Sequence, residues 1–306
     1  MSIAFLFPGR GSQRPGMLHR LPDTTASATV LAEADGALRA LVARSGAGTG
    51  AGAGGEHADS IAELDTAEAL ERSPVACHIA LFVAGVAGAR ALVEDEEVRP
   101  ALVAGHDVGG YAAAVLAEVL TFEEALRAVR LRGLLLERGE EPEGDVAVRL
   151  AQHLATIPRR PQAVPYVSGV FGRCLRGDTN AVFDDLARSV ALPVRWEEMT
   201  VALTQEGTRC CVELPPGRAL TGRVAAELPG MAAVSVEEHG IATAAELVRS
   251  ATGRPGKRSA DRDAAGLGEF GPIGFGPGTF GQGGAGQGPS DPHAGPAWRT
   301  DQSGLA

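Results

Sequence analysis

The sequence predicts an α/β protein built on a parallel sheet that is flanked by helices on both faces. Short apolar runs such as residues 3–7 lack the alternation of half-buried strands, as expected for strands buried on both sides. These runs alternate with longer segments of helical composition, an order that favours parallel strands joined by helices. A glycine-rich corner at residues 105–110 also separates an apolar run from a helical segment, which is a strand–turn–helix arrangement.

The first half of the chain contains the clearest helix signals. Ser73 and Pro74 combine an N-cap with a proline at the first helical position, and Thr121 with Glu124 is typical of a capping box. The predicted strands of this half are residues 3–7 and 100–104, and the predicted helices are residues 26–44, 74–94, 111–120 and 122–136.

The second half continues the alternation of strands and helices. Only residues 139–144 separate the helix that holds Arg132 from the next one. In an open parallel sheet, ligands bind beyond the carboxyl ends of the strands, where we expect both Arg10 and Asp107. The predicted strands are residues 164–170, 209–214 and 232–236, and the predicted helices are residues 145–157, 179–189, 197–205 and 243–249.

Composition divides the chain into a folded domain, residues 1–251, and a tail, residues 252–306. The tail is dominated by Gly, Pro, Ser and charged residues, and it cannot bury enough apolar surface to offset its ordering entropy. We expect it to be disordered, with aromatic residues that either contact partners or belong to a passive tail. Residues 46–55, rich in Gly and Ala, are predicted to form a flexible loop inside the domain.

Charge and hydropathy exclude several functional classes. The net charge of -10 argues against nucleic-acid or anionic-membrane partners, because phosphate binding needs a basic face. Residues 75–93 form the longest apolar stretch, but His78 and Arg90 interrupt it and favour a buried helix over a membrane span. The N-terminus lacks the features of a secretory signal, so we expect a cytoplasmic protein.

The four cysteines show no spacing typical of a metal site, so we expect no bound metal. Cys210 and Cys211 are adjacent in a strand-like run, and they are therefore expected to point to opposite faces of the sheet. Reduced thiols in the core are the favoured interpretation.

The glycine corner has the pattern of a nucleophile elbow, with Asp107 at its tip. Gly105 and Gly109 allow a tight turn that would display the residue between them. A neutral hydroxyl activated by a base forms an ester that a second acceptor can cleave. A carboxylate with a pKa of about 4 is a weak nucleophile towards a thioester, so the expected chemistry is altered at its central group.

The corner and three other segments together resemble malonyl-CoA:acyl-carrier-protein transacylases. Three further phrases are most similar to the epsilon subunit of malonate decarboxylase within that family. The four segments are residues 3–13 (IAFLFPGRGSQ), 105–111 (GHDVGGY), 122–136 (FEEALRAVRLRGLLL) and 192–196 (LPVRW), and the phrases are residues 14–18 (RPGML), 64–70 (LDTAEAL) and 213–217 (ELPPG).

The resemblance implies a fold, a ligand and partners. The implied fold is the acyltransferase, α/β-hydrolase-like core, with the family's small ferredoxin-like subdomain largely missing after the helix that holds Arg132. The implied substrate or ligand is malonyl-CoA, without a cofactor. The implied partners are an acyl carrier protein and, more specifically, malonate decarboxylase subunits.

The resemblance also implies roles for single residues. Asp107 occupies the position of the nucleophilic serine, and Arg132 that of the arginine that pairs with the malonyl carboxylate in two parallel hydrogen bonds. Arg10 and Val108 stand where backbone N–H groups build the oxyanion hole, and a backbone donor survives a change of side chain. Ser189 replaces a glutamine near the family's base.

The segment that supplies the base in the family is largely absent here, and three histidines are alternatives. His78 either approaches Asp107 as a carboxylate–imidazole pair or makes a structural hydrogen bond in the core. His106 belongs to the corner, and we expect its side chain to project away from Asp107. His153 is either a relocated base or a histidine at the surface, and its position in the following helix favours the surface.

Two classes of function follow. The first is an epsilon-like malonyltransferase in which Asp107 and the missing base make transfer weak or absent. The second is a non-catalytic protein that holds a malonyl or other acyl thioester through Arg132 and the elbow backbone, or that acts as a scaffold for a carrier protein.

Overall fold

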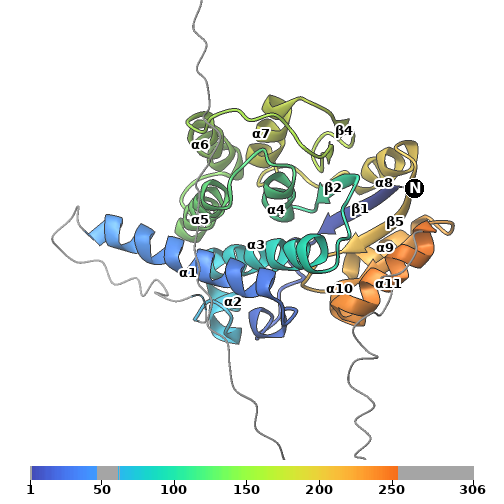
Figure 1. Cartoon of the computed structure of the whole chain (residues 1–306). Helices are drawn as coiled ribbons and strands as arrows, with labels where there is room; N and C mark the ends of the chain where they lie inside the picture. Colours follow the sequence, from blue (N-terminus) through green and yellow to red (C-terminus); the bar gives the residue numbers. More distant parts are fainter. Residues whose placement is uncertain (1, 47–60, 62, 254–306) are drawn as a thin grey trace, which may run out of the picture. The chain divides into compact units, whose positions relative to one another are not determined.

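The computed structural model describes residues 2–46, 61 and 63–253. Within them lies a six-stranded sheet in the order β4-β3-β2-β1-β5-β6, with helices packed around it (Figure 1). The strands are β1 (Ser2–Phe7), β2 (Leu102–Gly105), β3 (Tyr166–Val167), β4 (Cys174–Leu175), β5 (Thr208–Glu213) and β6 (Ala232–Ser235).

The predicted parallel sheet is confirmed for five of these strands. The pairs β1–β2, β1–β5, β2–β3 and β5–β6 are all parallel, while β4 pairs antiparallel with β3 at one edge. The sequence analysis missed β4 because a two-residue strand has no periodicity. The observed sheet is therefore mixed, with β1 at its centre and the functional corner at the end of its neighbour β2.

The sheet separates two apolar layers. Along β1, Ile3, Phe5 and Phe7 enter the larger cluster of core residues, and Ala4 and Leu6 enter the smaller one. The larger cluster includes most of α3, and the smaller one includes apolar residues of α8 and α9. Both faces are thus covered, which explains the continuous apolar character of the strands.

Each predicted helix is present, and α2, α9 and α10 were not predicted. Cys210 lies in the larger cluster and Cys211 in the smaller, so the predicted opposite orientation is confirmed. Among the described residues the α-helices are α1 (Thr25–Gly46), α2 (Ala67–Arg72), α3 (Pro74–Arg90), α4 (Gly109–Leu116), α5 (Phe122–Arg138), α6 (Glu143–Ala155), α7 (Thr179–Arg188), α8 (Trp196–Gln205), α9 (Ala219–Glu227), α10 (Val236–His239) and α11 (Ile241–Thr252), with short helices at Leu18–Arg20 and Ala91–Asp95.

Helix α3 is the central helix of the core. The Ser73 side chain accepts a hydrogen bond from the amide of Ala76, and Pro74 opens the helix, as predicted. Residues 74–95 are long and apolar enough to cross a membrane, since an 18-residue window within them has a mean hydropathy of 1.8, but 94% of that window is buried inside the protein. This burial supports the prediction of a core helix.

Two elements are shorter than predicted. Helix α4 ends at Leu116 rather than residue 120, because Glu118 takes a left-handed conformation with φ of 60°. The strand predicted at residues 164–170 is reduced to Tyr166–Val167, because the amide of Val170 donates to the side chain of Asp185 instead of a neighbouring strand. The end of α4 thus follows from local backbone geometry, and the end of β3 from a contact between distant segments. The periodicity of the sequence reveals neither.

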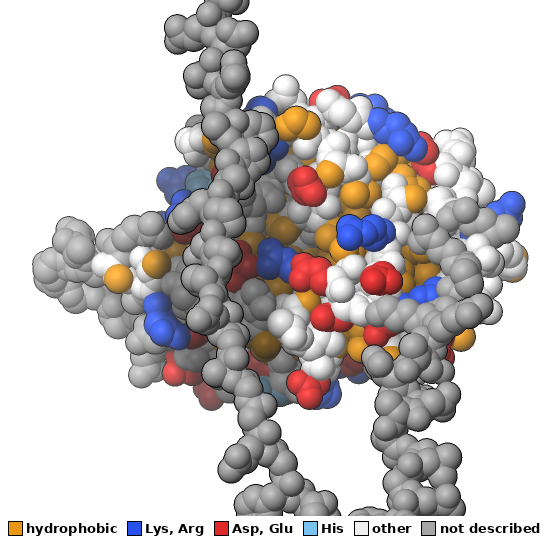
Figure 2. Space-filling model, in the orientation of Figure 1, with side chains coloured by type: hydrophobic (Ala, Val, Ile, Leu, Met, Phe, Trp, Pro, Cys, Tyr) orange, Lys and Arg blue, Asp and Glu red, His pale blue; other side chains and the backbone are white. Residues whose placement is uncertain are grey.

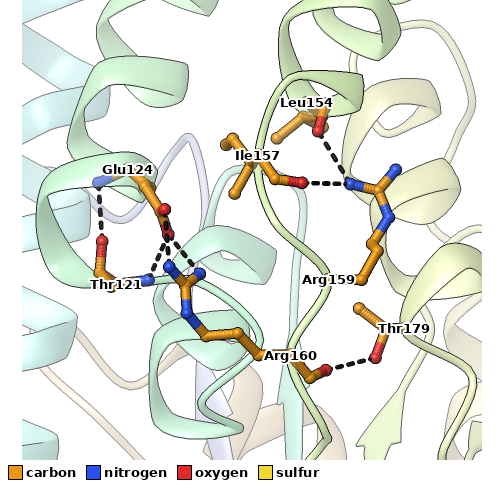
Figure 3. A network of polar contacts seen from close by, with 7 residues as sticks. All are labelled: Thr121, Glu124, Leu154, Ile157, Arg159, Arg160 and Thr179. Atoms are coloured by element: carbon orange, nitrogen blue, oxygen red, sulfur yellow. Dashed lines mark hydrogen bonds and ion pairs between the residues drawn. The ribbon is translucent and has the colours of Figure 1, made fainter.

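Helix α5 connects directly to α6. The predicted capping box of Thr121 and Glu124 is present at its start, and Gly139, with φ of 62°, ends it. Residues 139–142 then link α5 to α6, so no subdomain is inserted at this point. The segment after α6 is bound to the start of α5, since both terminal nitrogens of Arg160 donate to Glu124, at 2.6 and 2.9 Å (Figure 3).

The same segment is also hydrogen-bonded to the end of α6 and to the start of α7. Arg159 donates to the carbonyl oxygens of Leu154 and Ile157 at the end of α6, and the Thr179 hydroxyl donates to the carbonyl oxygen of Arg160 (Figure 3). These contacts fix α5, α6 and α7 as one group beside the corner.

Two predicted regions fall largely outside the described residues. Helix α1 is described as far as Gly46, and residues 47–55 of the predicted loop are not described. Helix α11 continues to Thr252, and residues 254–306 of the predicted tail are likewise outside the described part. The domain limits stay a prediction.

Candidate active site

The glycine corner lies at the carboxyl ends of two adjacent parallel strands. Phe7 of β1 is paired with Gly105 of β2, so the loops that follow these strands begin side by side. A cavity of about 600 Å³ opens at this edge of the sheet, in the size range of small-molecule sites. Its lining residues are Arg10, Gly11, His106, Asp107, Glu143, Ser189, Val190, Ala191, Leu192, Pro193 and Val194.

The backbone of the corner is tightly constrained. The amide of His106 donates to the carbonyl oxygen of Phe7 at 2.8 Å, and the amide of Gly110 donates to that of Asp107 at 3.1 Å. Asp107 has φ of 54°, in the left-handed region that a non-glycine residue rarely adopts. The strained residue is thus the one at the tip of the turn, as the sequence pattern predicts.

The two positions on either side of the turn, Gly105 and Gly109, have no space for a side chain. A Cβ atom at Gly105 would lie 2.2 Å from the amide nitrogen of Gly110. At Gly109 it would lie 2.3 Å from the carbonyl oxygen of Phe7. The spacing of these glycines therefore follows from the close approach of β1, β2 and the start of α4.

The carboxylate of Asp107 is held between two guanidinium groups. Nη2 of Arg132, on α5, donates to Oδ1, and Nε of Arg10, in the loop after β1, donates to Oδ2 at 2.7 Å. The side chain of Arg132 is fully buried, that of Asp107 is 8% exposed, and that of Arg10 is 47% exposed. Asp107 thus joins a buried guanidinium group to one that lines the cavity.

This arrangement keeps Asp107 ionised. Burial alone would raise its pKa, but the guanidinium groups of Arg132 and Arg10 outweigh burial and lower the pKa from 3.8 to about 2. At neutral pH the corner therefore displays a carboxylate with a hydrogen bond on each oxygen. Both features weaken it as a nucleophile.

Arg132 faces Asp107 rather than the cavity. It is absent from the cavity lining, and its Nε and Nη1 atoms are buried without a hydrogen-bond partner among the described residues. The resemblance assigns Arg132 and Asp107 to one site, and the two side chains are in contact here. The resemblance implies that the guanidinium group of Arg132 pairs with a substrate carboxylate. In this structure, however, it pairs with the carboxylate of Asp107.

The two predicted oxyanion donors flank Asp107. Arg10 lies in the loop after β1, and Val108 is the N-cap residue of α4. Neither backbone amide donates to an acceptor within residues 2–46, 61 and 63–253. Arg10 lines the cavity, whereas Val108 is fully buried and absent from the lining, so the oxyanion role of both amides stays a prediction.

Nδ1 of His78 makes neither the predicted pair with Asp107 nor a structural hydrogen bond in the core. This atom is buried without a hydrogen-bond partner in the described part of the chain, and no hydrogen bond joins His78 to Asp107 there. Burial and the charge of Arg132 lower its pKa from 6.5 to about 3. His78 is thus a neutral core residue near the charged cluster at physiological pH.

The other two histidines differ in position. His106 is half-buried and lines the cavity together with Asp107, and burial lowers its pKa. His153 lies on α6, outside the cavity lining, where burial also lowers its pKa. His153 therefore does not border the cavity beside Asp107. It is half-buried, with Nε2 buried and without a partner among the described residues, rather than a surface histidine.

One side of the cavity is an apolar wall that sequence reasoning missed. It consists of residues 190–194, between α7 and α8, and begins beside Ser189. The Ser189 hydroxyl donates to the carbonyl oxygen of Leu186 at 2.9 Å, so its hydrogen is already committed. Glu143, at the start of α6, also lines the cavity and was not foreseen, because its position depends on the direct link between α5 and α6.

Comparison with known proteins places these features in a family context. Residues 4–202 match the family model described as the acyl transferase domain. Polyketide synthase GfsB of Streptomyces halstedii is 36% identical over 202 residues, which cover 62% of this chain and 3% of that protein. The chain thus spans a small part of that synthase.

Smaller proteins match over more of their length. The malonyl CoA-acyl carrier protein transacylase of Salmonella typhimurium is 25% identical over 298 residues, covering 72% of this chain and 91% of the transacylase. A solved malonyl-transacylase in complex with its type II polyketide synthase acyl-carrier protein has a TM-score of 0.65 at 21% identity, covering 83% of this chain and 100% of that chain. The described residues share the fold of this solved structure.

Proposed function

Since this chain belongs to the acyl transferase domain family, we propose that it is a malonyl-CoA:acyl-carrier-protein transacylase homologue whose transfer activity is weak or absent. The observation that carries the proposal is the state of Asp107. Its carboxylate replaces the alcohol nucleophile and accepts hydrogen bonds from Arg132 and Arg10. No histidine of the described residues is hydrogen-bonded to it as a base.

The resemblance in three short phrases supports a more specific assignment. Residues 14–18, 64–70 and 213–217 are similar to the epsilon subunit of malonate decarboxylase. We therefore propose that the chain is epsilon-like, that it acts in the cytoplasm without a cofactor, and that its partners are an acyl carrier protein and malonate decarboxylase subunits. Genes for such subunits beside the gene of this chain would support the assignment.

An interaction with a carrier protein must satisfy the charge of this chain. With a net charge of -10, the chain can attract an acidic carrier only through local basic side chains. Figure 2 shows one face on which basic and acidic side chains are interspersed with apolar ones. Arg10, half-exposed at the cavity, is a basic residue in a position to contact such a partner.

The catalytic part of the proposal is tested by intact mass spectrometry of the full chain after incubation with malonyl-CoA. We expect no malonyl adduct on the wild type, because a paired carboxylate attacks the thioester poorly. Asp107→Ser, which restores an alcohol, is the matched variant and is expected to form at most a slow adduct without a base. A wild-type adduct formed at an enzymatic rate, with transfer to a carrier, would refute the proposal.

A second function, a non-catalytic protein that holds an acyl thioester or a carrier protein, is favoured by the intact cavity. The cavity keeps the ion pair of Asp107 with Arg10, the backbone amide of Arg10 and an apolar wall, although the nucleophile is altered. We expect acyl-CoA esters to raise the melting temperature of the wild type, and Ala191→Phe, which fills the cavity, to abolish that rise. Ala226→Phe on the exposed side of α9 is the control. An equal rise in both variants would contradict binding in this cavity.

A further inference from the structure

We propose that the cavity accepts acyl thioesters whose acyl group carries no free carboxylate, because Asp107, which lines the cavity, already pairs with Arg10 and with the buried Arg132. This inference rests on the proposed binding of a thioester in this cavity, and it names the acyl class. Acetyl and propionyl groups belong to that class, whereas a malonyl group does not.

The charges that face the cavity do not favour a carboxylate ligand. The charged residues of its lining are Arg10, Asp107 and Glu143, which supply one positive and two negative side chains. Arg10 is already paired with Asp107 at 2.7 Å. A ligand carboxylate near the floor would therefore meet the like charge of Asp107 without an unpaired cation on the lining.

The second guanidinium group is sealed from the cavity. Arg132 is fully buried, and its contact with Asp107 stands between it and the ligand space. Its unpartnered Nε and Nη1 atoms are buried as well. A ligand carboxylate could reach Arg132 only by displacing Asp107, and displacement would break an existing buried ion pair.

The remaining surface suits an uncharged alkyl group. The five residues of the wall, 190–194, are all apolar, and the Ser189 hydroxyl beside them donates to Leu186. The amide of Arg10 borders the cavity and donates to no acceptor among the described residues, so it can bind a thioester carbonyl oxygen, which is neutral. The floor and the wall thus recognise a carbonyl followed by a short hydrocarbon chain.

Isothermal titration of the full chain at pH 7.5 with propionyl-CoA, acetyl-CoA, malonyl-CoA and CoA tests this inference. We expect propionyl-CoA to bind the wild type at least about tenfold more tightly than malonyl-CoA, and more tightly than CoA. In Asp107→Ser, Arg132 loses its partner and becomes reachable, so the preference is expected to reverse toward malonyl-CoA. The comparison among ligands on the wild type decides the question even where that variant fails to fold.

Glu143→Gln is the matched control, because it also removes a carboxylate from the lining. Glu143 is exposed and its charge is screened, so the preference is expected to change by less than about threefold. A change as large as that of Asp107→Ser would overturn the specific role of the pair with Arg132.

The other outcomes separate this inference from the proposed function. Wild-type binding of malonyl-CoA as tight as that of propionyl-CoA, without a covalent adduct, overturns the inference alone. Equal affinity for CoA and propionyl-CoA also overturns it, since the acyl group would then make no contact. A malonyl adduct found by intact mass in the same samples overturns the inference and the proposed function together.

Discussion

Asp107 and Asp185 are both buried carboxylates, with exposed fractions of 8% and 2%, but their hydrogen-bond donors differ in charge. Asp107 accepts from two guanidinium groups. Asp185 accepts from the hydroxyls of Tyr166 and Ser168 and from the amide of Val170. The first group borders a cavity, and the second lies enclosed between α7 and β3.

The different donors shift the two pKa values in opposite directions. Burial raises the pKa of Asp185, and its neutral donors reverse only part of that rise. Burial acts in the same direction on Asp107, but the two positive charges lower its pKa to about 2. Burial alone thus does not decide the state of a carboxylate, because the charge of its donors does. The four predictions that follow can break or sharpen this comparison.

The largest expected effect concerns the inner guanidinium group. Arg132→Met leaves Asp107 as a buried carboxylate with one exposed partner, and we expect a loss of about 4 kcal/mol of unfolding free energy. Arg10→Met is the control, and its loss should stay below about 1 kcal/mol because Arg10 is half-exposed. Urea denaturation at pH 7 measures both. Equal losses would show that depth does not distinguish the two arginines.

Replacing Asp107 and Asp185 by asparagine tests whether their hydrogen-bond donors are charged or neutral. Guanidinium groups cannot accept a hydrogen bond, so Asp107→Asn turns its NH₂ toward donors, at an expected cost of about 3 kcal/mol. Hydroxyls can rotate and accept, so Asp185→Asn should cost only about 1 kcal/mol if its oxygen faces Val170. Urea denaturation ranks the two variants, and the reverse order would contradict the assigned donors.

Acid titration separates the two groups by sign. The pKa of Asp107 is lower in the folded state than the ordinary 3.8, so the unfolded chain binds this proton more tightly. Its stabilising contribution, about 2 kcal/mol, is complete above pH 4 and is lost as the pH falls toward 2. Asp107→Asn should lack this component when unfolding is followed by circular dichroism from pH 5 to 2. Because the pKa of Asp185 is raised, Asp185→Asn should instead make the unfolding free energy fall more steeply as the pH is lowered. A less steep fall would contradict the comparison.

The smallest effect tests a residue that borders both groups. The amide of Gly110 donates to the carbonyl oxygen of Asp107, and a Cβ atom at Gly110 would lie 2.8 Å from the Tyr166 hydroxyl. Gly110→Ala should push that hydroxyl away from Asp185 and cost about 1 to 2 kcal/mol. Gly144→Ala on α6, where no atom lies within 4 Å, should instead gain about 0.5 kcal/mol in thermal unfolding. If Gly110→Ala left the free energy of unfolding unchanged, Tyr166 would be free to move.

Local patterns predicted much of the fold. The caps at Ser73 and Thr121 and the apolar run of β1 depend only on near neighbours in the sequence, and all three are present. The short strand β4 and the early end of β3 depend on contacts such as that of Val170 with Asp185, which join residues far apart in the sequence. Helix α9 was missed although its residues pack on the smaller core cluster.

The resemblance assigned Arg10, Asp107 and Arg132 to one site, but it did not predict how their side chains pair. The strand order brought together only Arg10 and Asp107, because parallel strands end at the same edge of the sheet, whereas Arg132 lies on α5. Nothing in a linear pattern indicates that the Asp107 side chain reaches Arg132, since that contact depends on how α5 packs beside α4. The apolar wall before α8 depends on tertiary packing in the same way.

The adjacent thiols of β5 offer separate reporters for the two sides of the sheet. Burial raises the pKa of Cys210 to about 11 and that of Cys211 to about 12, so neither reacts readily while it is covered. One thiol becomes accessible when the helices around α3 detach, and the other when α8 and α9 detach. Two consecutive residues can therefore time, by pulsed alkylation, whether this protein opens from both sides at once or from one side first.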